Sequence, residues 1–98
     1  MVMACKNNIV FIHAINDEIK TLNTNIKIVK NLLSIKNIPY LAAKNAEKLL
    51  DVFTNIKKMF EDESESDLKK NAILEKLPLL YLQISRIKKQ INIGTSHD

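Results

Sequence analysis

Apolar residues recur at alternating spacings of three and four along the first third of the chain, and this pattern restricts the fold more than any other feature. Residues at such spacings share one stripe of an α-helix, and a stripe of this length suits a helix that packs lengthwise against other helices. We therefore predict a first helix over about residues 8–35. Its apolar stripe consists of Ile12, Ile15, Ile19, Leu22, Ile26, Val29 and Leu33.

Two later stretches repeat the three-and-four spacing. A second helix is predicted over residues 39–60, because Pro39 suits the first turn of a helix and disfavours helical geometry at Ile38. A third helix is predicted over residues 68–93. The second stripe consists of Ala42, Ala46, Leu49, Phe53, Ile56 and Phe60, and the third of Ile73, Leu77, Leu80, Ile84, Ile87 and Ile91.

Two polar segments and one proline set the limits of these helices. Residues 61–67 include five acidic residues and are expected to form a solvated loop. Residues 94–98 are expected to form a tail that follows a left-handed cap at Gly94. Pro78 either kinks the third helix or ends it and starts a fourth, and the unbroken phase of the apolar stripe across Pro78 favours a kink.

The scarcity of turn-forming residues also supports a helical fold. One Gly and two Pro occur among 98 residues, which is too few for the turns that a set of β-strands needs. The apolar stripes are wider than the seam of a two-stranded coiled coil, which favours a bundle. We predict a single all-α domain over residues 1–98, an antiparallel bundle of three helices with coiled-coil-like 3-4 seams and a length of about 35 Å. The bundle has four helices if Pro78 breaks the last one.

The chain offers few groups for catalysis or metal binding. Cys5, His13 and His97 show no spacing that is typical of a zinc site. Asp17 and Glu18 are adjacent, so on a helix they point about 100° apart and do not converge as an acid and a base. A single Gly rules out a Gly-rich phosphate-binding loop. We predict no catalytic residue, no metal ligand, no cofactor and no enzyme activity.

The net charge of +4 is the difference between 15 basic and 11 acidic residues, and the basic residues are spread along all the predicted helices. In an antiparallel bundle the pairs Lys57-Lys58 and Lys88-Lys89 lie at opposite ends, so they do not form one patch. A nucleic-acid partner is therefore disfavoured, and a membrane surface is a weaker hypothesis than a protein partner. The sequence shows no pattern of a signal peptide or a transmembrane segment, and a lone Cys requires no oxidising compartment, so we expect an intracellular, cytoplasmic protein.

Some apolar residues exceed what three helices need for their mutual packing. Apolar surface that a small chain leaves uncovered is usually covered by another chain. We therefore expect a small non-catalytic helical protein that binds a protein partner, or a second copy of itself, through an apolar helix face. The candidate partner-facing residues are Val10, Ile28, Ile35, Leu50, Leu79 and Leu82.

Two alternative functions remain open within the same class of helical proteins. In its length, basic charge, lack of catalytic residues and expected bundle, the chain is similar to small bacteriocin-immunity proteins, which implies a protective function. The other alternative is a subunit of a larger coiled-coil assembly, such as a cytoskeletal or chromosome-segregation complex, in which partner chains continue the apolar seams.

The acidic segment contains one candidate for modification. Ser64 is followed by Glu65 and, three residues on, by Asp67, which is a context that acidophilic kinases favour. A phosphate there adds a charge of about −1.5 to −2 beside the start of the third helix. Ser64 is therefore our candidate site of phosphorylation.

Overall fold

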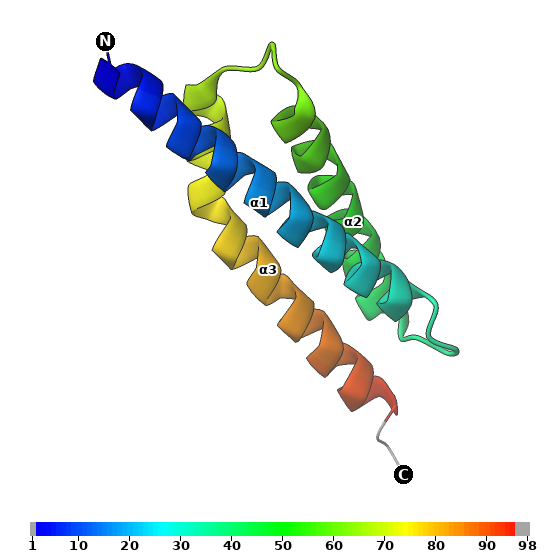
Figure 1. Ribbon diagram of the computed structural model, residues 1–98. Coiled ribbons are helices and arrows are strands. Elements are labelled where there is room, and N and C mark those ends of the chain that lie inside the picture. The colour runs from blue at the N-terminus through cyan, green and yellow to red at the C-terminus, as the bar shows by residue number, and fades with distance from the viewer. Residues whose placement is uncertain (1, 96–98) are drawn as a thin grey trace.

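The structure, a computed structural model, describes the backbone of residues 2–95 and the side chains of residues 11–92. Within this part of the chain there are three helices, α1 (Val2–Leu33), α2 (Tyr40–Glu61) and α3 (Asp67–Thr95), and no strand. Consecutive helices run in opposite directions (Figure 1). The predicted all-α antiparallel bundle is confirmed.

The first helix is longer than the sequence pattern predicted. It begins at Val2 rather than near residue 8. No Gly or Pro interrupts the first residues, and Met3 and Ala4 favour helical geometry. The helix ends where the Ser34 amide donates hydrogen bonds to the carbonyls of Lys30 and Asn31, and the turn that follows contains Asn37 at a φ of 62°. Asn accepts this left-handed conformation more readily than most residues, so it suits a reversal of chain direction.

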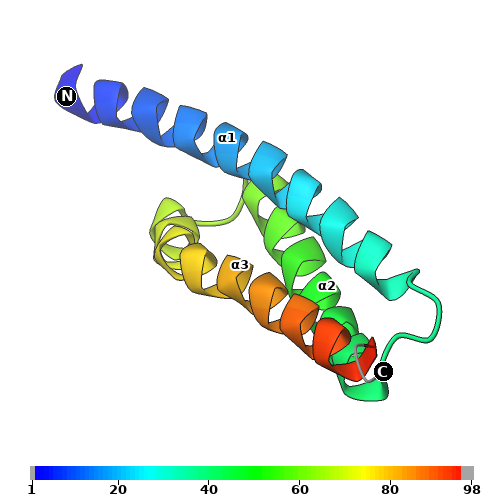
Figure 2. The ribbon, with the colours of Figure 1, turned by 90° about the horizontal axis from the view of Figure 1, so that it is seen from below.

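The third helix passes through Pro78 without a break, so the described residues contain no fourth helix. Figure 2 shows its first turns almost end-on, whereas the remaining turns run across the view, so the axis of α3 changes direction. A proline removes one backbone donor and presses on the carbonyl four residues earlier, at Leu74, which accounts for a kink there. The predicted cap at Gly94 is wrong, because α3 continues through Gly94 to Thr95. Glycine permits a left-handed cap but also accepts helical geometry.

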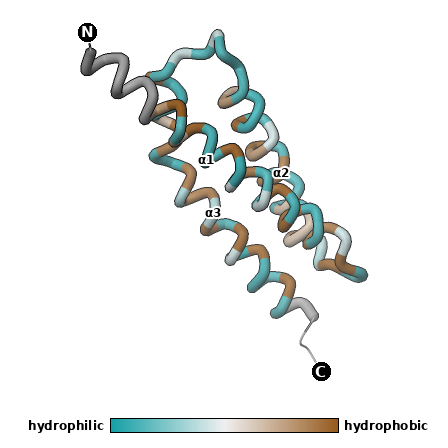
Figure 3. Tube along the Cα trace, in the orientation of Figure 1, coloured by the Kyte–Doolittle hydropathy of each residue, from teal (hydrophilic) through white to brown (hydrophobic). Residues whose placement is uncertain are grey.

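Helix α2 lies at the centre of the packing, because it contacts both α1 and α3 along its length, whereas α1 and α3 have few contacts with each other. Its complete predicted stripe is buried. In α3 the buried members of the predicted stripe are Leu77, Ile84, Ile87 and Ile91, while Ile73 and Leu80 pack against them and remain partly exposed. Figure 3 shows the apolar segments that recur along each helix.

The stripe of α1 alternates between two heptad positions, that is, two sets of residues spaced seven apart. Only one of these positions is fully buried. Those buried residues are Ile15, Leu22 and Val29. The other position is partly covered at Ile19, Ile26 and Leu33, and its first member, Ile12, is 55% exposed. The expectation that the whole stripe lies in the core is therefore wrong at Ile12. The reason is that α3 reaches α1 on the side of Glu18, about 100° around the helix from Ile19.

The described chain forms a long rod. Its extents are 64 × 18 × 17 Å, so it is longer than the 35 Å that we expected. The helices of 32 and 29 residues account for much of this length. They are also staggered, since the first turns of α1 project beyond the connection between α2 and α3 (Figure 2).

Candidate interaction surfaces

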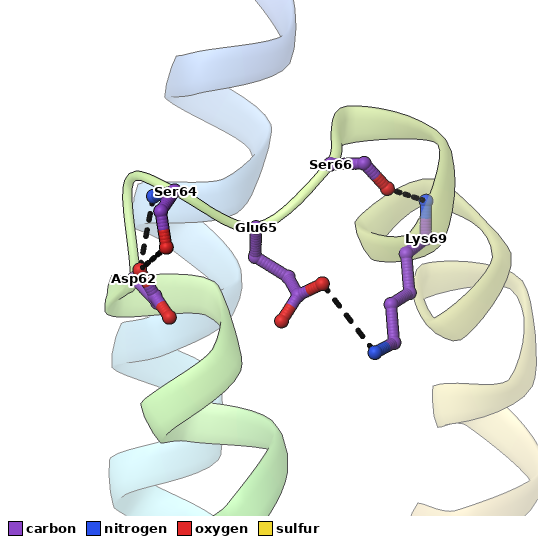
Figure 4. A network of polar contacts seen from close by, with 5 residues as sticks. All are labelled: Asp62, Ser64, Glu65, Ser66 and Lys69. Carbon is purple, nitrogen blue, oxygen red and sulfur yellow. Dashed lines mark hydrogen bonds and ion pairs between the residues drawn. The ribbon is translucent and has the colours of Figure 1, made fainter.

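The connection between α2 and α3 is held by its own polar side chains (Figure 4). Both the amide and the hydroxyl of Ser64 donate to Asp62 Oδ1, over 2.9 and 2.6 Å. These two hydrogen bonds hold the pKa of the Asp62 carboxyl below its usual value. Ser66 Oγ accepts from the Lys69 amide and so caps α3, and Glu65 pairs with the Lys69 ammonium over 3.4 Å. The predicted acidic loop is thus an ordered polar turn.

The predicted modification site, Ser64, is exposed in this turn. Its hydroxyl is a hydrogen-bond donor to Asp62, and a phosphate at this oxygen would lose that donor and add negative charge beside the carboxylate. Modification would therefore loosen the turn. Phosphorylation of Ser64 stays a prediction.

A pocket of about 610 Å³ lies between α1 and the α2–α3 connection. We call it the acidic pocket. Its apolar wall is formed by Phe11, Ile12, Ile15, Ile19 and Phe60. The carboxyl groups that line it belong to Glu61, Glu63 and Asp67. Since Ile12 is half-exposed and lines this pocket, the pocket presents an apolar surface next to negative charge.

Lys70 also lines the acidic pocket, and its side chain is only 7% exposed. Among the described residues, its ammonium group forms no direct ion pair. Its charge also acts at longer range on Asp62, because it lowers the pKa of that carboxyl in addition to the larger effect of the Ser64 hydrogen bonds. The pocket is therefore lined by one lysine and three carboxylates, and it keeps a net negative charge.

A second and shallower groove, of about 340 Å³, runs between α2 and α3. Asn45 Nδ2 donates to Gln90 Oε1 over 3.2 Å and links the two helices within it. Lys48 and Arg86 line the groove, and no acidic residue does. Neither cation forms an ion pair with any residue that the structure describes, so both charges are available to a partner.

Exposed apolar side chains lie on both helices that form this groove, and one of them, Val52, lines it. Leu79 and Leu82 on α3 are 65% and 59% exposed, and Leu41 and Val52 on α2 are exposed as well. Leu79 precedes Arg86 by seven residues and Leu82 precedes it by four, so all three lie close together on one side of α3. On α2, Leu41 and Val52 share a side with Lys48 by the same rule. We call this surface, made of Leu41, Lys48, Val52, Leu79, Leu82 and Arg86, the α2–α3 face.

The six residues that the sequence suggested for partner contact do not form one surface. Ile28 and Leu50 are partly buried against the core, and Ile35 is exposed in the turn after α1. Val10 lies outside the residues whose side chains are described. Leu79 and Leu82 alone come together, on the α2–α3 face. Sequence reasoning missed the other four residues of the face, Leu41, Lys48, Val52 and Arg86. The spacing of Leu41 and Lys48 from Val52, eleven and four residues, was a usable signal.

Charge is divided between the two ends of the rod. The structure places Lys57-Lys58 and Lys88-Lys89 at opposite ends, because α2 and α3 are antiparallel. However, Lys88-Lys89 joins other cations near the α1–α2 connection. Within residues 26–48 and 82–92 the basic residues are Lys27, Lys30, Lys36, Lys44, Lys48, Arg86, Lys88 and Lys89, and Glu47 is the one acidic residue in these ranges. The α2–α3 face is therefore set in a basic environment.

Comparison of the chain with protein-family models, with curated proteins and with solved structures found no match. Over the described residues, no helix combines the length and the apolar character needed to cross a membrane. In the same part of the chain, no three His, Cys, Asp or Glu residues are grouped as metal ligands.

Proposed function

We propose that this protein is a non-catalytic interaction protein that binds a helical partner protein on its α2–α3 face. The observation that carries the proposal is the exposure of Leu79 and Leu82 beside a groove with two unpaired cations. Fully burying a leucine side chain contributes about 1.5–3 kcal/mol, so covering both is a substantial driving force. A helix laid into the groove would supply that cover.

The charges of the face define the chemistry of the partner. Lys48 and Arg86 favour a partner helix that carries Asp or Glu next to its apolar residues. The exposed leucines favour a protein over a nucleic acid, because a phosphate backbone offers no apolar surface to cover them. The partner therefore presents apolar residues beside carboxylates, as an acidic amphipathic helix does. A protective function of the immunity type, or a place in a larger helical assembly, would use the same face.

A synthetic helical peptide tests this proposal. The probe has about five turns, Leu along one stripe and Glu on both flanks, and its binding is followed by fluorescence anisotropy. We expect Leu82→Asp to weaken binding by about tenfold or more, because one carboxylate replaces an apolar contact and repels the glutamates. The matched control is Leu68→Asp, since Leu68 is also exposed on α3 but lies about three turns before Leu79, beyond Pro78 and away from the residues that line the groove.

A second peptide, with Lys in place of Glu, distinguishes recognition of charge from non-specific hydrophobic binding. It should bind the wild-type protein far more weakly than the acidic peptide does, because Lys48 and Arg86 repel it. Equal binding of the two peptides, or an equal loss in Leu68→Asp and Leu82→Asp, would contradict the proposal.

A further inference from the structure

We infer that the partner for the α2–α3 face is a second copy of this chain, which docks through its acidic pocket. This inference rests on the proposed function: it keeps the α2–α3 face as the binding surface, and it names the acidic pocket of a second copy as the surface that covers the leucines. Its basis is that the chain carries both halves of one complementary contact. The α2–α3 face presents protruding leucines and unpaired cations, and the acidic pocket presents an apolar wall and carboxylates.

The two surfaces are complementary in shape as well as in charge, because one protrudes and the other is concave. Leu79 and Leu82 stand out from α3, with well over half of each side chain exposed. The acidic pocket is concave, holds about 610 Å³ and is walled by residues such as Ile12 and Phe60. Leucines from one copy can therefore enter the pocket of the next copy. Apolar anchors that fill a pocket are typical of the energetic centre of an interface.

The charges around the two surfaces fix the orientation of the contact. Glu61 and Glu63 line the pocket, whereas Lys48 and Arg86 lie beside the leucines. When the leucines enter the pocket, these carboxylates and cations meet at its edge. The opposite arrangement, pocket to pocket or face to face, would bring like charges together and is disfavoured.

The contact joins two different surfaces, so it is heterologous. The acidic pocket is lined by α1, and no residue of α1 lines the α2–α3 groove. After two copies have docked, the pair still has one free α2–α3 face and one free acidic pocket. Heterologous contacts of this kind extend into open chains unless a ring closes. The assembly should grow with concentration.

Light scattering of the purified chain over a dilution series is the first test. We expect the mean mass to rise above the 11.2 kDa of one chain as the concentration increases. Two variants remove one surface each: Leu82→Asp disrupts the α2–α3 face, and Glu61→Lys with Glu63→Lys reverses the acidic pocket. Each should remain at the mass of one chain. All three positions are exposed, so helicity by circular dichroism should match that of the wild type.

The decisive step is to mix the two variants in equal amounts. Each keeps the surface that the other lacks, so one contact forms and neither end can extend. The mixture should give a pair with twice the mass of one chain and no larger species. The matched control, Asp17→Lys with Glu47→Lys, makes the same charge change at exposed sites that line neither surface, and it should assemble like the wild type. If Leu82→Asp loses helicity, Leu79→Asp replaces it.

Three results would overturn the inference: a wild type that stays at the mass of one chain at every concentration, a Leu82→Asp variant that assembles like the wild type, or a mixture without pairs. These results are distinct from a failure of the proposed function. A wild type that stays at one chain but binds the acidic peptide would remove the second copy as partner and leave the α2–α3 face as a binding site.

Discussion

The hydroxyl of Tyr81 on α3 donates a 2.5 Å hydrogen bond to Glu18 Oε2 on α1. The ring of Tyr81 also packs against Phe53 of α2, with the centroids 5.6 Å apart and the planes tilted by 52°. One side chain therefore contacts all three helices. Because α1 and α3 have few other contacts, this bond is a main link between them.

Replacing this tyrosine should destabilise the bundle. Tyr81→Phe keeps the ring but leaves the half-buried Glu18 carboxylate without its donor, which costs about 1.5–3 kcal/mol of unfolding free energy. Urea denaturation measures this loss. Tyr40→Phe is the matched control, because Tyr40 is exposed and its hydroxyl makes no described contact between helices. An equal, small effect of both substitutions would contradict the role given to Tyr81.

The same tyrosine should give the protein a pH dependence at high pH. Burial, together with the neighbouring Glu18 carboxylate, raises the pKa of Tyr81 above its ordinary value of 10.0. The pKa of Tyr81 is higher in the folded state than in the unfolded state. Its contribution to the unfolding free energy is therefore complete below pH 10.0 and declines as the pH rises above that value. The difference in unfolding free energy between the wild type and Tyr81→Phe should therefore shrink above that pH. A difference that stays constant into the alkaline range would refute this account.

Two leucines that are only two residues apart should respond very differently to truncation. Leu77 is fully buried, whereas Leu79 is 65% exposed. Leu77→Ala should lower the unfolding free energy by about 2–5 kcal/mol, because it opens a cavity in the core. Leu79→Ala should change it by no more than about 0.5 kcal/mol, measured at a concentration where the chain is unassembled. Comparable losses in the two variants would show that α3 is rotated relative to this structure.

The two serines of the polar turn before α3, Ser64 and Ser66, should have different effects when they are replaced. Ser64→Ala removes the hydroxyl that donates to Asp62, so the pKa of the Asp62 carboxyl should rise toward its usual value. Ser66→Ala removes the cap of α3 and should lower stability by about 1 kcal/mol without this rise. Carboxyl NMR titration and thermal unfolding measure the two effects. The proposed turn is wrong if the pKa of Asp62 responds to Ser66→Ala and not to Ser64→Ala.

Much of the core follows from the spacing of apolar residues alone. The stripe of α2 was predicted completely, because α2 has a neighbour on each side and its whole apolar stripe is covered. The stripe of α1 was predicted less well. Ile12 and Ile15 both fit the three-and-four pattern. Which side of α1 faces a neighbour, however, depends on where α3 crosses α1. The contact between Glu18 and Tyr81, which are 63 residues apart in sequence, marks that crossing, and no local pattern predicts it.

The interaction surfaces were only partly predictable for a similar reason. Leu79 and Leu82 follow from the excess of apolar residues on α3. Their grouping with Lys48 depends on the register between α2 and α3, which the bond between Asn45 and Gln90 shows and no local pattern encodes. The acidic pocket likewise joins Ile12 to Glu63, from opposite halves of the chain.

The central claim is that the α2–α3 face is the surface through which this protein binds. Titration of the isotope-labelled protein with the acidic amphipathic peptide, followed by two-dimensional NMR, tests it most directly. We predict that the largest shifts occur at Val52, Leu79 and Leu82. Shifts confined to other exposed apolar residues, such as Ile35 and Leu68, would contradict the claim and place the binding surface elsewhere.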